Sequence, residues 1–168
     1  MPLVPSSAPF PGIDPMPPSD VLRALALPLP PAPKPVGAYT PCLRMGNLLY
    51  TSGHLPLLPD GSLLRGKVGV ELDADAGKAA ARQVACAILA TVENALGSVD
   101  RVKRVVKVLG MVNCTPDFTK QPHVLNGCSE LFAEIWGREA GIGVRSAFGV
   151  AALPENVPVE IEAVFEVE

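Results

Sequence analysis

Two residues near the C-terminal end have side chains that could act together on a small molecule, Arg145 and Glu160. A guanidinium offers a planar fork of donors that fits a carboxylate, and a nearby glutamate can position or activate water. Arg145 stands between a glycine-containing loop and a strand-like run, and Glu160 follows a turn at residues 154–156. A hairpin would bring the two together, and on spacing alone a structural salt bridge within that hairpin is the simpler interpretation.

The run that carries Glu160 alternates strictly. Val159, Ile161, Ala163, Phe165 and Val167 share one face, which is typical of a half-buried strand. The opposite face carries Glu160, Glu162 and Glu166 together with Val164, and a solvated face is the simplest interpretation for Glu162 and Glu166.

The elements that must position these residues follow from periodicity and turn signals. A helix is predicted from Asp73 or Asp75 to about Leu96, with many alanines on its apolar face. A second helix is predicted over 124–136, and strands over 39–43, 47–52, 102–112, 146–153 and 159–167. The order β-β-α-β-α-β-β predicts an α+β domain in which two helices pack on a mostly antiparallel sheet.

Proline divides the N-terminal part from this domain, since 12 of the 19 prolines lie within residues 1–35. We expect residues 1–18 to be a disordered tail, 19–36 a short helix with an extended arm, and 37–168 the folded domain. Residues 1–18 lack the basic and apolar regions of a signal peptide, so a cytoplasmic location is expected.

Charge and composition argue against several classes of protein. The net charge is −3, and the basic residues 101–107 alternate with valines, so no nucleic-acid partner is expected. No apolar run reaches about 18 residues, so no membrane span is predicted, and the 48% apolar content indicates a subunit interface instead. The four cysteines form no CxxC pair, and neither histidine has partners at metal-ligand spacing. No metal or cofactor is expected.

Motifs at both ends of the domain resemble one known family. Gly37-Ala-Tyr39 followed by Gly46-Asn-Leu-Leu-Tyr-Thr-Ser-Gly-His-Leu-Pro56 is similar to the opening of reactive intermediate deaminases, the Rid or YjgF-like superfamily. Arg145-Ser-Ala-Phe-Gly-Val-Ala-Ala-Leu-Pro154 with Val159-Glu-Ile-Glu-Ala163 is similar to that family's closing signature. The resemblance covers about residues 37–168.

This resemblance implies a chorismate-mutase-like fold and a homotrimer with three clefts between subunits. It implies that the clefts bind 2-imino and 2-oxo acids or similar small carboxylates, with Arg145 as the carboxylate anchor and Glu160 as the residue that positions water. Tyr39, Ser52, Gly53 and Asn126 would line the cleft. The implied reaction is hydrolysis of small 2-imino acids or enamines to 2-oxo acids and ammonia.

Several positions depart from the family pattern and indicate a divergent subgroup. His54 stands where glutamine is usual, as a conformational or rim residue or one that alters substrate preference. Ala147 and Phe148 follow Arg145, where residue size shapes the pocket, and the connection 61–75 is long. A non-catalytic module that binds small carboxylates is therefore the alternative. Endoribonuclease activity, a label often attached to the family, finds little support in a chain with 5% aromatic residues.

Overall fold

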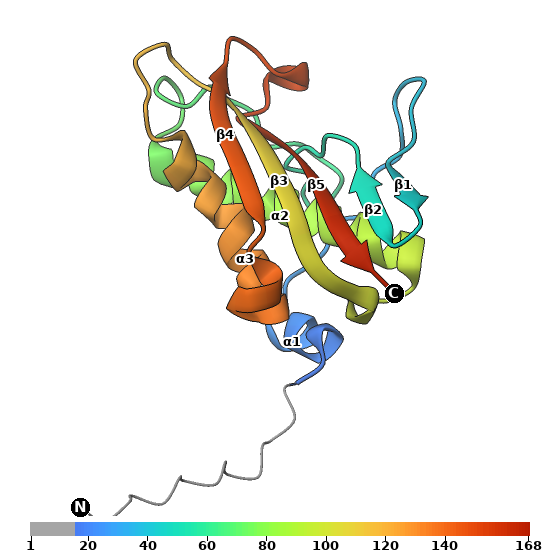
Figure 1. Cartoon of the computed structure of the whole chain (residues 1–168). Coiled ribbons are helices and arrows are strands. Elements are labelled where there is room, and N and C mark those ends of the chain that lie inside the picture. The colour runs from blue at the N-terminus through green and yellow to red at the C-terminus, as the bar shows by residue number, and fades with distance from the viewer. Residues whose placement is uncertain (1–15) are drawn as a thin grey trace, which may run out of the picture.

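A five-stranded sheet is the centre of the computed structural model, which describes residues 16–168 (Figure 1). The strand order is β1-β2-β5-β3-β4. The bounds are Cys42–Met45 for β1, Leu48–Thr51 for β2, Val102–Asn113 for β3, Val144–Val150 for β4 and Val159–Val167 for β5. All neighbours are antiparallel except β3 and β4, which are parallel. The α+β class and the mostly antiparallel sheet are thus confirmed.

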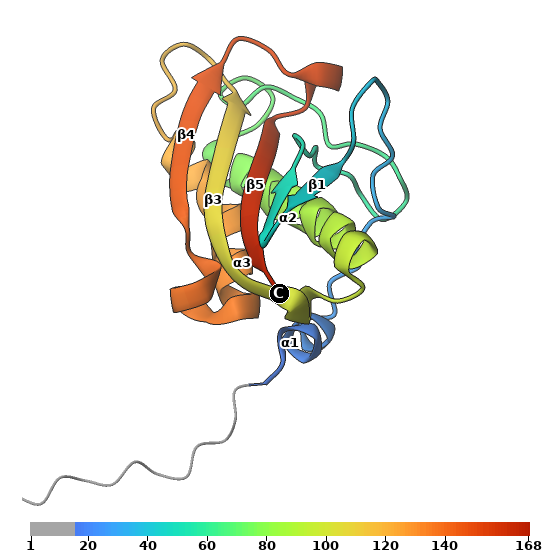
Figure 2. The ribbon, with the colours of Figure 1, turned by 45° about the vertical axis from the view of Figure 1, so that its right-hand side comes forward.

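Two long helices, α2 (Ala74–Leu96) and α3 (Gln121–Gly141), lie on the same face of this sheet (Figures 1 and 2). Asp73 caps α2 by accepting a hydrogen bond from the amide of Ala76, and Gly97 ends it with φ 83°. Five of the 13 buried residues of α2 are alanines, and these small side chains let the helix lie close to its neighbours.

The core lies between the helices and the inner face of the sheet. All five apolar residues that alternate along β5 are buried, as their spacing predicts. Phe165 packs against Phe132 and Trp136 of α3, with ring centroids 5.4–5.8 Å apart in each pair. Such tilted and edge-on contacts stabilise the core beyond simple burial.

The N-terminal arm packs on the domain. Helix α1 (Pro18–Ala24) lies at the start of the segment 19–36, where a short helix is expected, and its Leu22 is buried. The Ser19 backbone amide and hydroxyl donate to the Asp100 carboxylate at 2.8 and 2.7 Å, which anchors α1 to the 3-10 turn Val99–Arg101. Most of the tail predicted over 1–18 lies outside the described residues.

Several element boundaries differ from those predicted, among them β4, which spans Val144–Val150 and not 146–153. The first hairpin turns at Gly46 and Asn47, not at residues 44–46, because the turn needs a positive φ and Gly46 supplies 61°. Helix α3 begins three residues before the predicted start, and its last turn continues past Gly137, whose φ of 75° interrupts the helix.

The expected hairpin between the strands of Arg145 and Glu160 is wrong. Strand β3 lies between β4 and β5, and β4 runs parallel to β3 after the crossover helix α3. Among residues 16–168 no ion pair joins Arg145 to Glu160, so the structural salt bridge is also absent from the described chain.

The other face of the sheet carries no helix (Figure 1), and several of its apolar side chains are exposed. Its large exposed apolar residues are Leu43, Met45, Tyr50, Val144 and Phe148. We refer to this surface as the open face. Within residues 16–168 no helix has the length and apolar content that a membrane crossing requires.

Candidate functional site

Arg145 lies on the edge strand β4 and faces α3. Its register partner on β3 is Val108, a residue buried under the helices. The side chain borders a hollow of about 370 Å³ between α3 and the start of β4, which we call the arginine hollow. The residues around this hollow include Asn126, Ser129, Glu130, Arg138, Gly143 and Arg145.

The guanidinium of Arg145 is held by three hydrogen bonds from one side. Its Nη1 donates to Asn126 Oδ1 and to Ser129 Oγ, both at 3.0 Å, and its Nη2 donates to the Pro122 carbonyl at 3.2 Å. Among the described residues Nε has no partner, and no carboxylate pairs with the group. Nε–H and the remaining Nη2–H are therefore available to a ligand carboxylate.

This arrangement changes the interpretation of Asn126. The resemblance implied that Asn126 lines the pocket, and it does border the arginine hollow. Its side-chain oxygen, however, accepts from Arg145, so its contact in this chain orients the anchor.

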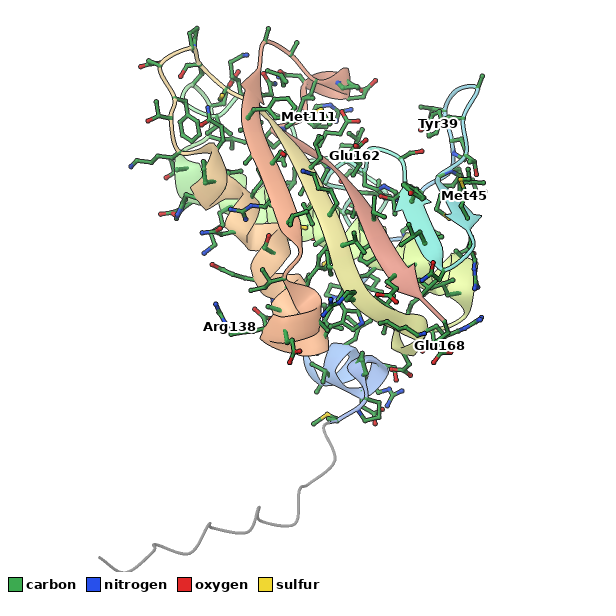
Figure 3. The ribbon with its side chains drawn as sticks, in the orientation of Figure 1. Tyr39, Met45, Met111, Arg138, Glu162 and Glu168 are labelled. Carbon is green, nitrogen blue, oxygen red and sulfur yellow. The ribbon has the colours of Figure 1, made fainter. Side chains whose placement is uncertain are left out.

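Glu160 lies in a second hollow, of about 470 Å³, on the open side of the sheet. We call it the glutamate hollow, and its lining residues are Val36, Tyr39, Ser52, Gly53, Leu55, Pro154, Glu160 and Glu162. The structure thus brings Tyr39, Ser52, Gly53 and Glu160 together, as the resemblance implied. Figure 3 shows Tyr39 on the loop before β1 and Glu162 on β5.

The carboxyl group of Glu160 has an altered proton affinity. Partial burial raises its pKa, and repulsion from Glu162 on the same face of β5 raises it further. Glu160 lies against the backbone of Gly53, where an added Cβ would stand 2.0 Å from Glu160 Oε1. A glycine at this position is what lets the carboxylate approach the main chain.

The two hollows open on opposite faces of the sheet in one chain. Arg145 faces the helices, whereas Glu160 alternates with the buried Val159 and Ile161 and so points to the open side. One chain alone therefore does not bring the two predicted catalytic residues together.

Two further residues with structural roles at these hollows were missed or only partly understood. Ser129 is one turn from Asn126 on α3, and this spacing is the signal that could have identified it. His54 is 3% exposed, which excludes the role of a rim residue.

Comparison with known proteins identifies the family of the chain. Residues 19–164 match the family described as "YjgF/chorismate_mutase-like, putative endoribonuclease". Protein TCP17 of Trypanosoma cruzi is 41% identical over 145 residues, which cover 86% of this chain and 91% of that protein. The 2-iminobutanoate/2-iminopropanoate deaminase of Escherichia coli strain K12 is 35% identical over 133 residues, covering 79% and 90%.

Solved structures give the same result. The crystal structure of protein Atu1372 from Agrobacterium tumefaciens superposes with a TM-score of 0.82 at 38% identity and covers 90% of this chain and 94% of that one. The match over nearly the whole described fold, with both terminal motifs in place, shows that the chain belongs to the YjgF/chorismate mutase-like family.

Proposed function

We propose that this protein hydrolyses small 2-imino acids, or the enamines in equilibrium with them, to 2-oxo acids and ammonia. The observation that carries the proposal is the Arg145 guanidinium, which three hydrogen bonds hold in place while its Nε edge stays free. Such an edge fits a carboxylate with two parallel hydrogen bonds. The 35% identical relative named as an iminobutanoate and iminopropanoate deaminase supports this choice of substrate.

The complete site would form between copies of the chain in a homotrimer. Arg145 and Glu160 lie on opposite faces of one sheet, so a neighbouring copy must supply one of them. The open face supports this assembly, because large apolar side chains exposed together on one sheet face are typical of subunit interfaces.

In the proposed reaction, Arg145 fixes the substrate carboxylate and Glu160 orients a water molecule toward the imine carbon. The water oxygen adds to that carbon, and Glu160 accepts the water proton and returns it to the nitrogen. The C–N bond then breaks as Glu160 accepts the proton of the new hydroxyl group, so that the carbonyl of the 2-oxo acid forms and ammonia leaves. The proton on Glu160 passes to ammonia or solvent. A protonated imine is already electrophilic, so orientation and charge placement suffice without a strong nucleophile.

The test generates 2-iminopropanoate from alanine with an amino-acid oxidase and follows its decay. The protein should accelerate the decay, and Arg145→Ala and Glu160→Gln should each abolish the acceleration. If the wild-type protein instead binds pyruvate, with binding lost in Arg145→Ala, but accelerates no imine, the non-catalytic binding module is correct.

A mixing experiment tests whether the site is shared. Arg145→Ala and Glu160→Gln chains, unfolded together in equal amounts and refolded, should recover about a quarter of the wild-type rate, because random assembly leaves that share of interfaces with both residues intact. Each variant refolded alone is the control. If the mixture is as inactive as its parents, the shared cleft is wrong.

A further inference from the structure

We propose that His54 is a positioning residue, whose neutral ring fixes the Ser52–Gly53 peptide so that the Gly53 N–H points into the glutamate hollow. The geometric part is independent of the proposed function, and its consequence for turnover rests on that function. The position of Gly53 then makes its amide a donor for an oxygen of the ligand beside Glu160.

The ring of His54 spans the distance between helix α2 and the loop after β2. Its Nδ1 lies 2.8 Å from the Ser52 carbonyl oxygen, and its Nε2 lies 2.7 Å from Thr91 Oγ1 on α2. Both His54 and Thr91 are 3% exposed, so the bond between them is shielded from bulk water, and the bond to Ser52 is partly buried. The His54 backbone exchanges two hydrogen bonds with Ile161, the residue after Glu160, at 2.8 and 3.0 Å.

These contacts determine where the ring proton lies. A carbonyl oxygen can only accept, so Nδ1 must carry the hydrogen that it donates to Ser52. Nε2 of the neutral ring then accepts from the Thr91 hydroxyl. Both ring nitrogens are satisfied, and the side chain has one orientation in which this holds.

The planarity of the peptide bond transmits this orientation to Gly53. In a trans peptide the C=O of one residue and the N–H of the next point in opposite directions. The Ser52 carbonyl points toward His54 and α2, so the Gly53 N–H points away from α2 and toward the open side. There the amide has no hydrogen-bond partner among the described residues, and Gly53 and Glu160 line the same hollow.

The chain allows this peptide to be observed directly. Ser52–Gly53 is the only Ser-Gly pair in the sequence. Protein made with carbonyl-¹³C serine and ¹⁵N glycine therefore gives one carbon-coupled amide signal in an NMR spectrum, that of Gly53.

Substitutions of His54 and Thr91 distinguish a role in orienting the Ser52–Gly53 peptide from a role in core packing. His54→Gln keeps an amide donor for Ser52 and an acceptor for Thr91, whereas His54→Leu fills a similar space without either. We expect the Gly53 signal of His54→Gln to stay near that of the wild type, and that of His54→Leu to shift or broaden as the peptide loses its fixed direction. Thr91→Val, which removes the second partner at constant shape, should give an intermediate change even if His54→Leu does not fold.

Ligand binding and the rate of imine hydrolysis provide a second test. Pyruvate should shift the Gly53 signal in the wild type and in His54→Gln. His54→Gln should keep kcat/KM for the imine within about threefold, and His54→Leu should lower it about tenfold or more, the scale of one lost hydrogen bond to a charged group.

The outcomes are distinguishable from failure of the proposed reaction. An unchanged Gly53 signal in both His54→Leu and Thr91→Val would overturn the inference, whether or not the protein is an enzyme. A wild-type protein with no imine hydrolysis but with the expected Gly53 changes would overturn the proposed function alone.

Discussion

At the scale of residues, the anchor depends on its neighbours as much as on its own charge. Arg145 receives its direction from Asn126 and Ser129, one turn apart on α3, and from the carbonyl of Pro122. A guanidinium that is already oriented loses less entropy when it binds a carboxylate. Binding, more than the chemical step, should respond when this support is weakened.

Ser129→Ala tests that expectation. Loss of the hydroxyl removes one of three hydrogen bonds to Arg145, at a cost of about 1 kcal/mol, so KM for the imine should rise about fivefold while kcat changes little. Ser129→Thr, which keeps the hydroxyl, is the matched control in steady-state kinetics. A fall in kcat at constant KM would contradict a role in ground-state orientation.

His54 also makes stability depend on pH. Burial lowers its pKa below the ordinary value of about 6.5. The folded state therefore binds the proton less readily than the unfolded state, and the stability due to the neutral ring is present above about pH 6.5 and is lost as the pH falls through the folded pKa.

The free energy of unfolding of the wild type should thus decline more steeply below pH 6.5 than that of His54→Gln, which has no group to titrate there. Denaturant titrations at a series of pH values measure the difference. Parallel pH dependence of the two proteins would show that the ring contributes nothing to it.

At the scale of elements, the spacing between α2 and α3 is set by a glycine. An added Cβ at Gly127 would stand 2.0 Å from the backbone carbonyl oxygen of Lys78, so the helices touch main chain to main chain. Backbone contacts cannot yield as a flexible side chain can.

Gly127→Ala should therefore destabilise the protein by about 1–3 kcal/mol, the usual range for overpacking a close contact. Gly37→Ala is the control, because the nearest atom to its added Cβ is 3.6 Å away, and its effect should stay within about 0.5 kcal/mol. Thermal unfolding of both variants gives the comparison. Equal losses in the two would contradict the close-packing argument.

Local pattern predicted the individual elements but not their order in the sheet. Strand β5 and helix α2 could be predicted closely, because their signals lie in residues that are near one another in the sequence. These signals are the alternation from Val159 to Val167 and the helix caps at Asp73 and Gly97. Which strands pair is decided by packing over the whole chain. Nothing in the sequence near Arg145 or Glu160 indicates that β3 lies between β4 and β5.

The candidate site, too, could be predicted from local motifs only in part, because its contacts depend on long-range packing. Motif resemblance placed Tyr39, Ser52, Gly53 and Glu160 in one cleft with Arg145 and Asn126. In a single chain the first four border one hollow and the last two border the other. The resemblance did not indicate that Asn126 accepts a hydrogen bond from Arg145, because this contact depends on how β4 packs against α3.

At the scale of the whole molecule, the open face is the feature that most needs a partner. Met45 and Val144 are 63% and 67% exposed on a sheet face that no helix covers (Figure 1). A charge placed there would be buried without a counter-ion in the proposed trimer.

Met45→Asp should therefore shift the protein toward monomers and lower the imine-hydrolysis rate, as measured by light scattering and by the oxidase assay. Val70→Asp is the matched control, since Val70 is 66% exposed but lies in the loop before α2. A trimer that persists in Met45→Asp, or a wild-type monomer at micromolar concentration, would contradict the assembly.

Because Arg145 and Glu160 face opposite sides of the sheet, the activity per chain should depend on the protein concentration. If each complete site needs two chains, the number of working sites does not scale with the amount of protein once its concentration falls below that needed for assembly. Specific activity would then drop on dilution with no change in any residue. Because β3 lies between β4 and β5, the specific activity of the protein would thus depend on its concentration.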